Sequence, residues 1–410
     1  VLCQWMNNSL KPMFLNNRTP PHISTLILLS GIGALSMNMF LPSLPQMTID
    51  LETEYSVMQL SVSLYLGFTA ITQFFIGPIS DKYGRRACTL VGVAIFVLAS
   101  VGCYFSQNIE TFLIFRMIQA IVAIGMVLSR AIIRDTVAQD KSASMIGYVT
   151  MGMALVPMFA PALGGIIDTY LGWRANFGFM AVFGLFFWIL LWFDQGETNS
   201  SKGQSFLTQV KQYPELFSAR RFWGYALAAA FASGTFFAFL GGAPYVATVI
   251  YKLPPTMTGL LFGIPAVGYL LGNLITGLYS TKFGINKLIM IGTVVLFTGM
   301  LLSLVITSSI LDGPIVFFSF CMFVGFGNGL VLPNAQAGML SVRPKLAGTA
   351  SGIGGAIMIG GGAALAGLAG TLLERGSSSQ PLQIIMLISS IFSLLSIYYV
   401  VKREKIIQKS

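Results

Sequence analysis

Long apolar blocks separated by short polar stretches run along the whole chain. Each block extends over about 20 residues, the length that an α-helix needs to cross a hydrocarbon core about 30 Å thick. Twelve blocks can be marked, at about residues 24–44, 57–79, 87–107, 111–132, 143–167, 173–193, 223–250, 257–280, 287–308, 314–336, 346–372 and 382–401. The pattern therefore predicts an all-α integral membrane protein with twelve transmembrane helices.

The longest polar stretch, residues 195–221, separates the sixth block from the seventh and is expected to be a cytoplasmic linker. An internal repeat supports a division at this point. GPISDKYG follows the second block at residues 77–84, and GLYSTKFG follows the eighth at residues 277–284. We therefore predict two pseudo-symmetric six-helix bundles, residues 23–194 and 222–402, with a binding site between them at mid-depth.

Basic side chains are distributed unevenly between the two sides of the predicted membrane. Twenty of the 24 Lys and Arg residues fall on the side of the two chain ends, and only Arg174, Lys252 and Arg375 fall on the other. Because loops rich in Lys and Arg stay in the cytoplasm, we expect cytoplasmic tails at residues 1–22 and 403–410. The predicted location is the inner (cytoplasmic) membrane, crossed many times.

The composition excludes several classes of protein. Of the 410 residues, 55% are hydrophobic and 9% are charged, against about 25% charged residues in soluble domains. These values exclude a disordered chain, a secreted disulfide scaffold and an ordinary soluble enzyme. The net charge of +10 lies in the short loops, so it does not indicate a nucleic-acid partner. Four scattered cysteines and one histidine, His22, offer no metal site.

The loop after the second block has the composition of a tight turn with charged flanks. It reads GPISDKYGRR over residues 77–86. Asp81 can cap backbone N–H groups, and Arg85 and Arg86 can bridge to neighbouring helix ends. The decapeptide resembles the signature loop of the major facilitator superfamily, which implies a latch that holds the cytoplasmic side closed in the outward-facing state. The expected latch residues are Gly77, Asp81, Gly84, Arg85, Arg86 and, as a further partner, Asp135.

The fifth block contains two prolines and a glycine pair. Pro157 and Pro161 remove helix hydrogen bonds and bend the span, and Gly164 and Gly165 permit close helix contact. This arrangement resembles the fifth-helix motif of facilitator antiporters. The resemblance implies export by exchange.

Further strings are similar to one subgroup, the bicyclomycin- and chloramphenicol-resistance type of drug exporter (Bcr/CflA). They are FLPSLP (40–45), QLSVSL (59–64), RMIQA (116–120), RAIIRD (130–135), GWR (172–174), LPNA (332–335) and AGTAS (347–351). The likeness runs from about residue 25 to residue 360. It implies multidrug efflux, antibiotic resistance and drug:H⁺ antiport.

Arg116 is the one residue clearly predicted to carry a charge within the membrane. It lies six residues after Glu110, a residue of an outer loop, and is therefore about 9 Å deep at 1.5 Å per residue. Asn38 lies at a similar depth in the first block. The subgroup pattern has an aspartate at this position, implied to be the proton carrier, and an asparagine cannot titrate.

Two hypotheses follow from Asn38. If proton coupling is present, it must use a peripheral acid, such as Asp81 or Asp135, or protons that the substrate carries. Arg116 has no carboxylate partner at its depth and is free to bind a neutral or anionic substrate. The other predicted cavity residues are neutral: Tyr65, Gln73, Gln119, Tyr148, Asn273, Asn328, Asn334 and Gln336. Each of these alone is better explained by a hydrogen bond between helices.

The sequence thus predicts a secondary active transporter that exports drugs or metabolites by alternating access and proton antiport. An alternative keeps the fold but makes the chain an uncoupled or differently coupled exporter of one metabolite or siderophore. An enzyme is disfavoured because the chain has no metal cluster, no buried carboxylate pair and no Gly-x-Ser-x-Gly motif. We expect no cofactor, a proton gradient as energy source, a small-molecule substrate, the lipid bilayer as surroundings, and a monomer.

Overall fold

The structure is a computed structural model of the whole chain. It describes residues 14–136, 145, 149, 156, 159–199, 213–309, 312–343, 347–373 and 378–407. Within these residues all regular secondary structure is helical, and eleven helical segments are long and apolar enough to cross a membrane. The predicted all-α membrane fold is therefore confirmed for the described part of the chain.

The fifth predicted block, residues 143–167, lies mostly outside the described residues. Its last part is helical, and this helix runs through residues 159–171. Each of the other eleven blocks corresponds to one of the membrane-spanning segments. The count of twelve helices therefore stays a prediction.

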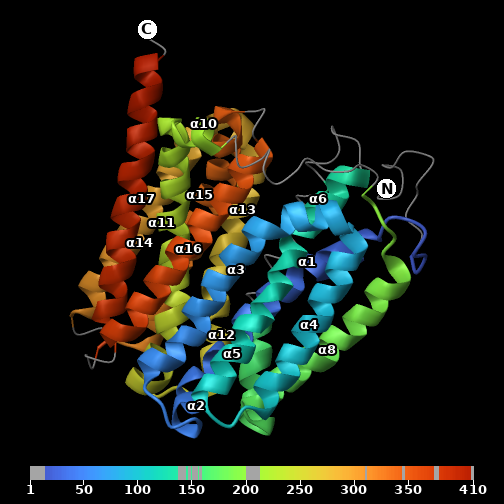
Figure 1. Cartoon of the computed structure of the whole chain (residues 1–410). Helices are drawn as coiled ribbons and strands as arrows, with labels where there is room; N and C mark the ends of the chain where they lie inside the picture. Colours follow the sequence, from blue (N-terminus) through green and yellow to red (C-terminus); the bar gives the residue numbers. More distant parts are fainter. Residues whose placement is uncertain are drawn as a thin grey trace.

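The helices form two bundles that stand side by side, with α3 and α16 packed together at their junction (Figure 1). The first bundle contains α1 (Ile23–Asn38), α2 (Leu44–Asp50), α3 (Tyr55–Tyr83), α4 (Arg85–Phe105), α5 (Ile109–Gln119), α6 (Ile124–Thr136), the helix of residues 159–171, and α8 (Arg174–Asp194). The second contains α11 (Arg220–Tyr245), α12 (Pro255–Leu261), α13 (Gly263–Phe283), α14 (Ile285–Thr307), α15 (Pro314–Val342), α16 (Ala347–Leu373) and α17 (Gln380–Ile407). The short helix α10 (Tyr213–Phe217) precedes α11.

Two of the predicted blocks contain a break in the α-helix. The first helix ends at Asn38, and a 3₁₀ turn over Leu41–Ser43 leads into α2. Pro42 favours this break because it has no N–H group to continue the helical hydrogen bonds, and Pro45 lies in the first turn of α2, where no such bond is needed. In the fourth block a 3₁₀ turn over Ala120–Ala123 joins α5 to α6. Both breaks lie close to the side chains that surround Arg116.

The packing of the first bundle is repeated in the second. Helix α4 packs on α8 as α14 packs on α17, and α3 packs on α5 and α6 as α13 packs on α15. The turns that enter α4 and α14 each contain a glycine with positive φ, +94° at Gly84 and +79° at Gly284. Because side chains other than that of glycine are strained there, both repeats end on a glycine. The sequence repeat thus reflects the same turn conformation in both bundles.

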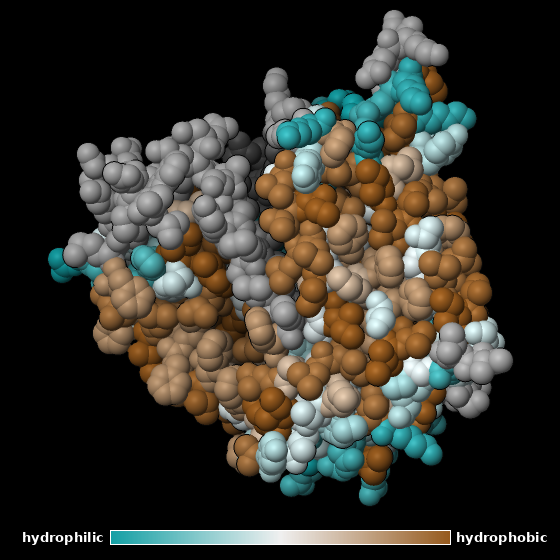
Figure 2. Space-filling view, turned by 180° about the vertical axis from the view of Figure 1, so that it is seen from behind, coloured by the Kyte–Doolittle hydropathy of each residue, from teal (hydrophilic) through white to brown (hydrophobic). Residues whose placement is uncertain are grey.

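The chain passes from the first bundle to the second at one end of the molecule. Helices α8 and α17 end there and α11 begins there, at the top of Figure 1; we call it the linker end. Figure 2 shows apolar side chains over the middle of one face and hydrophilic side chains at its two ends. This distribution matches a protein whose middle lies in hydrocarbon.

Candidate functional site

Arg116 on α5 lies inside the first bundle and connects its helices. Its exposed fraction is 1%. Nη2 and Nη1 donate to the carbonyl and hydroxyl oxygens of Ser36 at 3.0 and 3.1 Å, and Nε donates to the carbonyl oxygen of Ser61 at 3.3 Å. The ring centroids of Phe40 and Tyr65 lie 4.3 and 3.9 Å from its Cζ atom. Carbonyl dipoles and aromatic faces therefore stabilise the charge.

Gln119 completes this cluster, one turn after Arg116. Its side-chain oxygen accepts a hydrogen bond from Arg116, and its amide donates to the Ser100 hydroxyl at 2.8 Å. Among the described residues no Asp or Glu forms an ion pair with Arg116. The guanidinium is enclosed by protein rather than lipid. In this conformation its N–H groups donate hydrogen bonds to residues of the first bundle. That Arg116 binds cargo stays a prediction.

Asn38 lies at the depth of Arg116 but on the other side of α1. Ser36 and Phe40 point toward Arg116, and a residue midway between them lies on the opposite helix face, at about 100° per residue. Asn38 is 2% exposed, and its amide donates to the carbonyl oxygen of Ala34 at 2.7 Å. Its Oδ1 atom is buried without a hydrogen-bond partner among the described residues. An unpaired buried acceptor is costly. A hydrogen bond donated to this oxygen by water or by cargo would therefore be favourable.

The two bundles are closed against each other at the end opposite the linker end. The Tyr55 hydroxyl on α3 donates to the carbonyl oxygen of Gly241 on α11 at 2.9 Å. One turn further along α3, the Gln59 amide donates to the carbonyl oxygen of Ala366 on α16 at 3.0 Å. These side chains seal the junction of α3 with the second bundle.

The fifth helix makes a second seal at the same end, against α12. A Cβ atom at Gly165 would meet the carbonyl oxygen of Pro255, and one at Gly259 would meet that of Pro161. The hydroxyl groups of Thr169 and Thr256 are 2.6 Å apart. The backbones of the two bundles therefore touch where only glycine fits.

The other residues of the predicted antiporter motif differ in position. A Cβ atom at Gly164 would meet the carbonyl oxygen of Met39, so this glycine permits contact with the first helix of its own bundle. Pro157 lies outside the described residues. The glycine pair therefore serves two contacts, one within the first bundle and one between the bundles.

Toward the linker end the two bundles diverge. Along α3 and α16 the contact extends to Gln73, whose Oε1 atom is 3.8 Å from the position of a Cβ on Gly355. One turn further on, Gly77 of α3 and Gly352 of α16 have no atom of the described residues within 4 Å of an added Cβ. Among the described residues, the two bundles thus touch at one end and separate along α3 and α16 toward the linker end.

The predicted asparagines on α15 have different surroundings. The Asn334 amide donates to the Thr276 hydroxyl on α13 at 3.2 Å, so it joins two helices. The Asn328 amide donates to the carbonyl oxygen of Val324 at 3.0 Å, while its Oδ1 atom is buried without a partner among the described residues. Asn328 therefore resembles Asn38 in offering an unused acceptor.

The remaining predicted cavity residues contact their own bundle or lie outside the described part. The Gln73 amide approaches the sulfur of Met126 at 3.7 Å, and the Asn273 amide donates to the carbonyl oxygen of Tyr269, one turn earlier, at 2.8 Å. Gln336 is half-buried on α15. Tyr148 lies outside the described residues. Their role in binding cargo stays a prediction.

Arg130 lies in a different place from the one that the charge pattern suggests. The count of basic residues places it with the cytoplasmic loops, although the fourth predicted block, 111–132, includes it; it belongs to α6 and to the membrane-spanning segment Ile109–Ile133. Its guanidinium interacts electrostatically with Tyr269 on α13 of the second bundle. Among the described residues no carboxylate forms an ion pair with it. The sequence signal for this position is its spacing: Arg130 precedes Arg134 by one full helical turn.

The predicted latch residues gather at the linker end of the first bundle. The Arg85 side chain is 4% exposed and forms ion pairs with Asp81 at 2.5 Å and with Asp135 at 3.0 Å. It also donates to the Ser80 hydroxyl. These contacts join α3, α4 and α6 within one bundle. An arginine held by two carboxylates resists displacement more than a single exposed pair does.

Glu197, just after α8, is a partner of this cluster that the sequence pattern does not indicate. Its carboxylate accepts hydrogen bonds from the backbone N–H groups of Arg85 at 2.9 Å and Arg86 at 3.2 Å. A Cβ atom at Gly84 would collide with it. Glu197 thus caps the start of α4, where a negative charge is favourable. No local motif marks a capping residue this far along the chain.

Arg86 holds the end of α8 to the start of α4. It donates to the carbonyl oxygen of Trp192 at 2.9 Å and to that of Gln195. The second bundle has a related clamp at Glu404 of α17, which pairs with Arg221 and accepts a hydrogen bond from Asn286 at the start of α14. This anchoring accompanies the extension of α17 to Ile407, past the predicted end of the last block at residue 401.

Comparison with known proteins places these features in a family. The family model of the Major Facilitator Superfamily matches residues 26–367 and 232–407. An uncharacterized MFS-type transporter, YdgK, of Bacillus subtilis is 29% identical, covering 93% of this chain and 96% of the relative. The bicyclomycin resistance protein homolog of Haemophilus influenzae is 27% identical, covering 93% and 98%. The chloramphenicol resistance protein of Pseudomonas aeruginosa is 30% identical, covering 85% and 83%.

Solved structures show the same fold. A D-xylose-proton symporter matches with a TM-score of 0.70 at 16% identity, covering 90% of this chain and 95% of the symporter. A bacterial homolog of the human lysosomal transporter Spinster, in an inward-facing and unoccupied conformation, matches with a TM-score of 0.69 at 15% identity, covering 92% and 95%. At such identities the likeness concerns the fold alone.

Proposed function

The chain belongs to the major facilitator superfamily, and we propose that it is a secondary active transporter that exports small organic molecules, drugs included. Relatives of nearly full length named for resistance to bicyclomycin and chloramphenicol support this assignment. The likeness of the sequence strings to the Bcr/CflA subgroup agrees with it. Transport of this kind requires a pathway that is open to one side of the membrane at a time.

The observation that carries the proposal is the seal between the fifth helix and α12. Thr169, Gly165 and Pro161 meet the second bundle at one end, while toward the other end no described residue lies within 4 Å of an added Cβ on Gly77 or Gly352. With the linker end in the cytoplasm, this is an inward-facing conformation. Export then needs the seal to open and the linker end to close.

We propose further that the cargo is neutral or anionic. In the described spans the carboxylates lie only at the ends, as Asp50, Glu110, Asp194 and Glu404 do. The spans contain Arg116 and Arg130 instead. A lipophilic cation gains nothing from such surroundings, because a charge in low dielectric needs an opposite partner.

Asn38 favours a second candidate, an exporter of one metabolite without proton coupling. If coupling is present, the Arg85-paired acids Asp81 and Asp135, or protons carried by the cargo, supply it. We further propose that the protein lies in the inner membrane with cytoplasmic tails and works as a monomer. It needs no cofactor, and a proton gradient is its energy source.

Uptake into inverted membrane vesicles tests these proposals. The panel contains chloramphenicol, an organic acid and a lipophilic cation, each with and without a protonophore, against vesicles that lack the protein. We expect uptake of the neutral or anionic compounds that falls with the protonophore. Uptake that persists favours the uncoupled exporter, selective uptake of the cation contradicts the cargo proposal, and no protein-dependent uptake of any compound contradicts the proposed export.

A further inference from the structure

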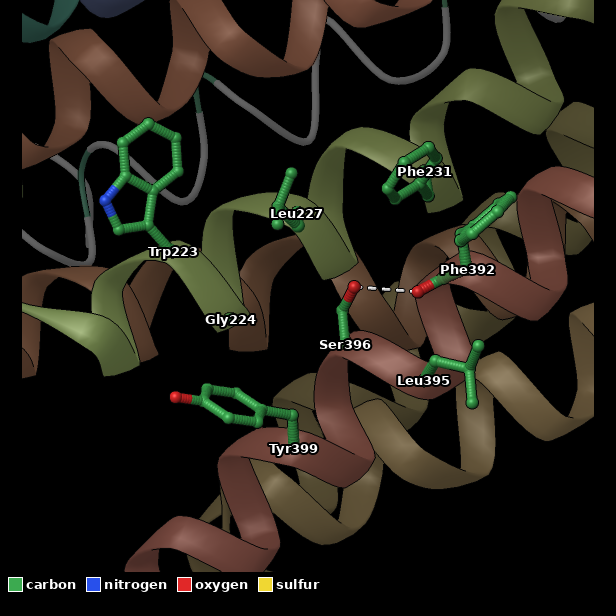
Figure 3. Close-up of a pocket in the computed structure, with 8 residues that line it drawn as sticks. All are labelled: Trp223, Gly224, Leu227, Phe231, Phe392, Leu395, Ser396 and Tyr399. Atoms are coloured by element: carbon green, nitrogen blue, oxygen red, sulfur yellow. Dashed lines mark hydrogen bonds between the residues drawn. The ribbon is translucent and has the colours of Figure 1, made fainter.

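A groove on the second bundle lies between α11 and α17, away from the junction of the two bundles (Figure 3). Its volume is about 300 Å³. The lining residues are Trp223, Gly224, Leu227 and Phe231 of α11 and Phe392, Leu395, Ser396 and Tyr399 of α17. The groove is not part of the transport pathway described above.

The shape of the groove follows from small residues placed between large ones. A Cβ atom at Gly224 would meet the side chain of Val400, so the two helices touch there. The large side chains of Trp223 and Tyr399 stand on either side of this contact (Figure 3). The Ser396 hydroxyl donates to the carbonyl oxygen of Phe392 at 2.7 Å and is thereby satisfied. The groove is accordingly suited to an apolar ligand.

The groove is elongated along the helices and open to the surroundings. From Trp223 to Phe231 it extends about 12 Å at 1.5 Å per residue. The rings of Phe231 and Phe392 stack at a centroid distance of 5.1 Å at the end away from the linker end. Leu395 and Tyr399 are 55% and 43% exposed. A narrow, open, apolar trough of this length fits a hydrocarbon chain.

Basic side chains continue the same helix faces beyond the groove, toward the linker end. Arg220 lies one turn before Trp223 and Gly224, and Lys402 and Arg403 lie one turn after Tyr399. Residues three and four apart share a helix face, so these cations stand at the mouth of the groove. Arg220 and Lys402 are exposed.

The charge at this mouth is not neutralised by the protein. The nearby Glu404 pairs with Arg221 and accepts from Asn286. Among the described residues no Asp or Glu forms an ion pair with Arg220, Lys402 or Arg403. A negatively charged group is therefore the complement of this mouth.

We propose that the groove binds one anionic phospholipid, with an acyl chain between α11 and α17 and the phosphate group between Arg220, Lys402 and Arg403. Trp223 and Tyr399 then lie at the level where the chain joins the headgroup, which is the depth that these residues prefer in membranes. Basic pockets between transmembrane helices hold anionic headgroups in this way. The site is independent of the transported cargo.

Native mass spectrometry of the purified full chain tests the proposal, with phosphatidylglycerol and phosphatidylcholine of identical acyl chains as probes. We expect one phosphatidylglycerol to bind on the order of a hundredfold more tightly than phosphatidylcholine, because three basic residues face its phosphate group. The double variant R220Q/R403Q should lose this preference. The variant Leu395→Trp, which fills the trough, should lose bound lipid of both kinds.

Lys282→Gln is the matched control, because Lys282 is an exposed basic residue at the linker end of α13, outside the groove. It should bind phosphatidylglycerol like the natural chain. The proposal is overturned if R220Q/R403Q keeps the preference, if Leu395→Trp binds lipid normally, or if Lys282→Gln loses as much as the double variant. Quenching by brominated phosphatidylglycerol should be weaker in Trp223→Phe than in the natural chain, because no other tryptophan of the described residues lines the groove. This difference gives an independent readout in folded protein.

Discussion

Asn38 and Arg116 lie at the same depth in the first bundle, yet their surroundings differ. Arg116 has carbonyl and hydroxyl partners on several sides, whereas the Asn38 side chain has a buried oxygen without a described partner. The likeness of the strings to the subgroup identified Asn38 as a departure from its pattern. This likeness could not reveal that Ser36 and Phe40 contact Arg116 while Asn38 lies on the opposite face of the first helix. The face on which a residue lies depends on where the helix breaks.

The variant Asn38→Asp should change both cargo and pH dependence. A carboxylate at this position adds a titratable group and a negative charge to a part of the span that has neither. We expect uptake into inverted vesicles to become pH-dependent and to include a lipophilic cation. Asn38→Ser, which stays neutral, serves as the control. If the aspartate variant transports the same compounds with the same pH profile, the hypotheses drawn from Asn38 are wrong.

The variant Arg116→Gln should lower stability rather than affect transport alone. A shorter, neutral side chain loses the hydrogen bonds to Ser36 and Ser61 within the bundle, at a cost of about 3 kcal/mol. Thermal unfolding in detergent should show a lower Tm than in the natural chain. Lys252→Gln, on a loop, should leave the Tm unchanged. A variant of normal Tm that has lost only cargo binding would show instead that Arg116 serves the cargo.

At the scale of single elements, the fifth helix shows what a motif can and cannot predict. Two adjacent glycines indicate a close helix contact, but not which helix makes it. Gly164 meets the first helix of its own bundle, whereas Gly165 meets α12 of the other. The partner depends on the arrangement of the bundles, and only the structure supplies it.

The variant Gly165→Val should open the seal. The added side chain would collide with the Pro255 carbonyl, and such overpacking costs about 1–3 kcal/mol in the sealed conformation. We expect lower transport and stronger labelling of Thr169→Cys by a membrane-impermeant thiol reagent from the outside. Gly67→Val is the matched control, since Gly67 lies in a helix and no described residue is within 4 Å of its Cβ position. Equal labelling of both variants would contradict the assigned seal.

Glu197 illustrates the limit of pattern-based prediction for a helix start. The decapeptide at residues 77–86 predicts a turn and an ion-paired arginine, and the structure contains both. The carboxylate that caps α4 comes from a residue more than a hundred positions later. Only the return of α8 to the same end of the bundle brings it there.

Glu197→Gln should therefore weaken the start of α4. Loss of the negative charge at two backbone N–H groups is expected to cost about 1 kcal/mol. Hydrogen exchange at Arg85 and Arg86 should become faster, while exchange in the middle of α4 stays the same. Glu52→Gln, an exposed loop variant, controls for the change in net charge. Unchanged exchange at the start of α4 would mean that Glu197 is not its cap.

At the scale of the whole molecule, the sequence predicts the fold well. Eleven of the predicted spans are found in the described residues, and the repeat at Gly84 and Gly284 is a true structural repeat. The conformation was not predictable, because open and closed forms contain the same helices. It follows from contacts such as Gln59 with Ala366, which join residues far apart in the chain.

If opening and closing of the two bundles moves the cargo, a reversible crosslink across the seal must stop transport. In a chain without its native cysteines, T169C/T256C places two thiols where the hydroxyl groups are 2.6 Å apart. The control S43C/N176C links two residues of the first bundle, whose side chains are 3.2 Å apart. We predict that oxidation stops transport by T169C/T256C, that a reductant restores it, and that the control is unaffected by either. Undiminished transport by fully crosslinked T169C/T256C would contradict the account.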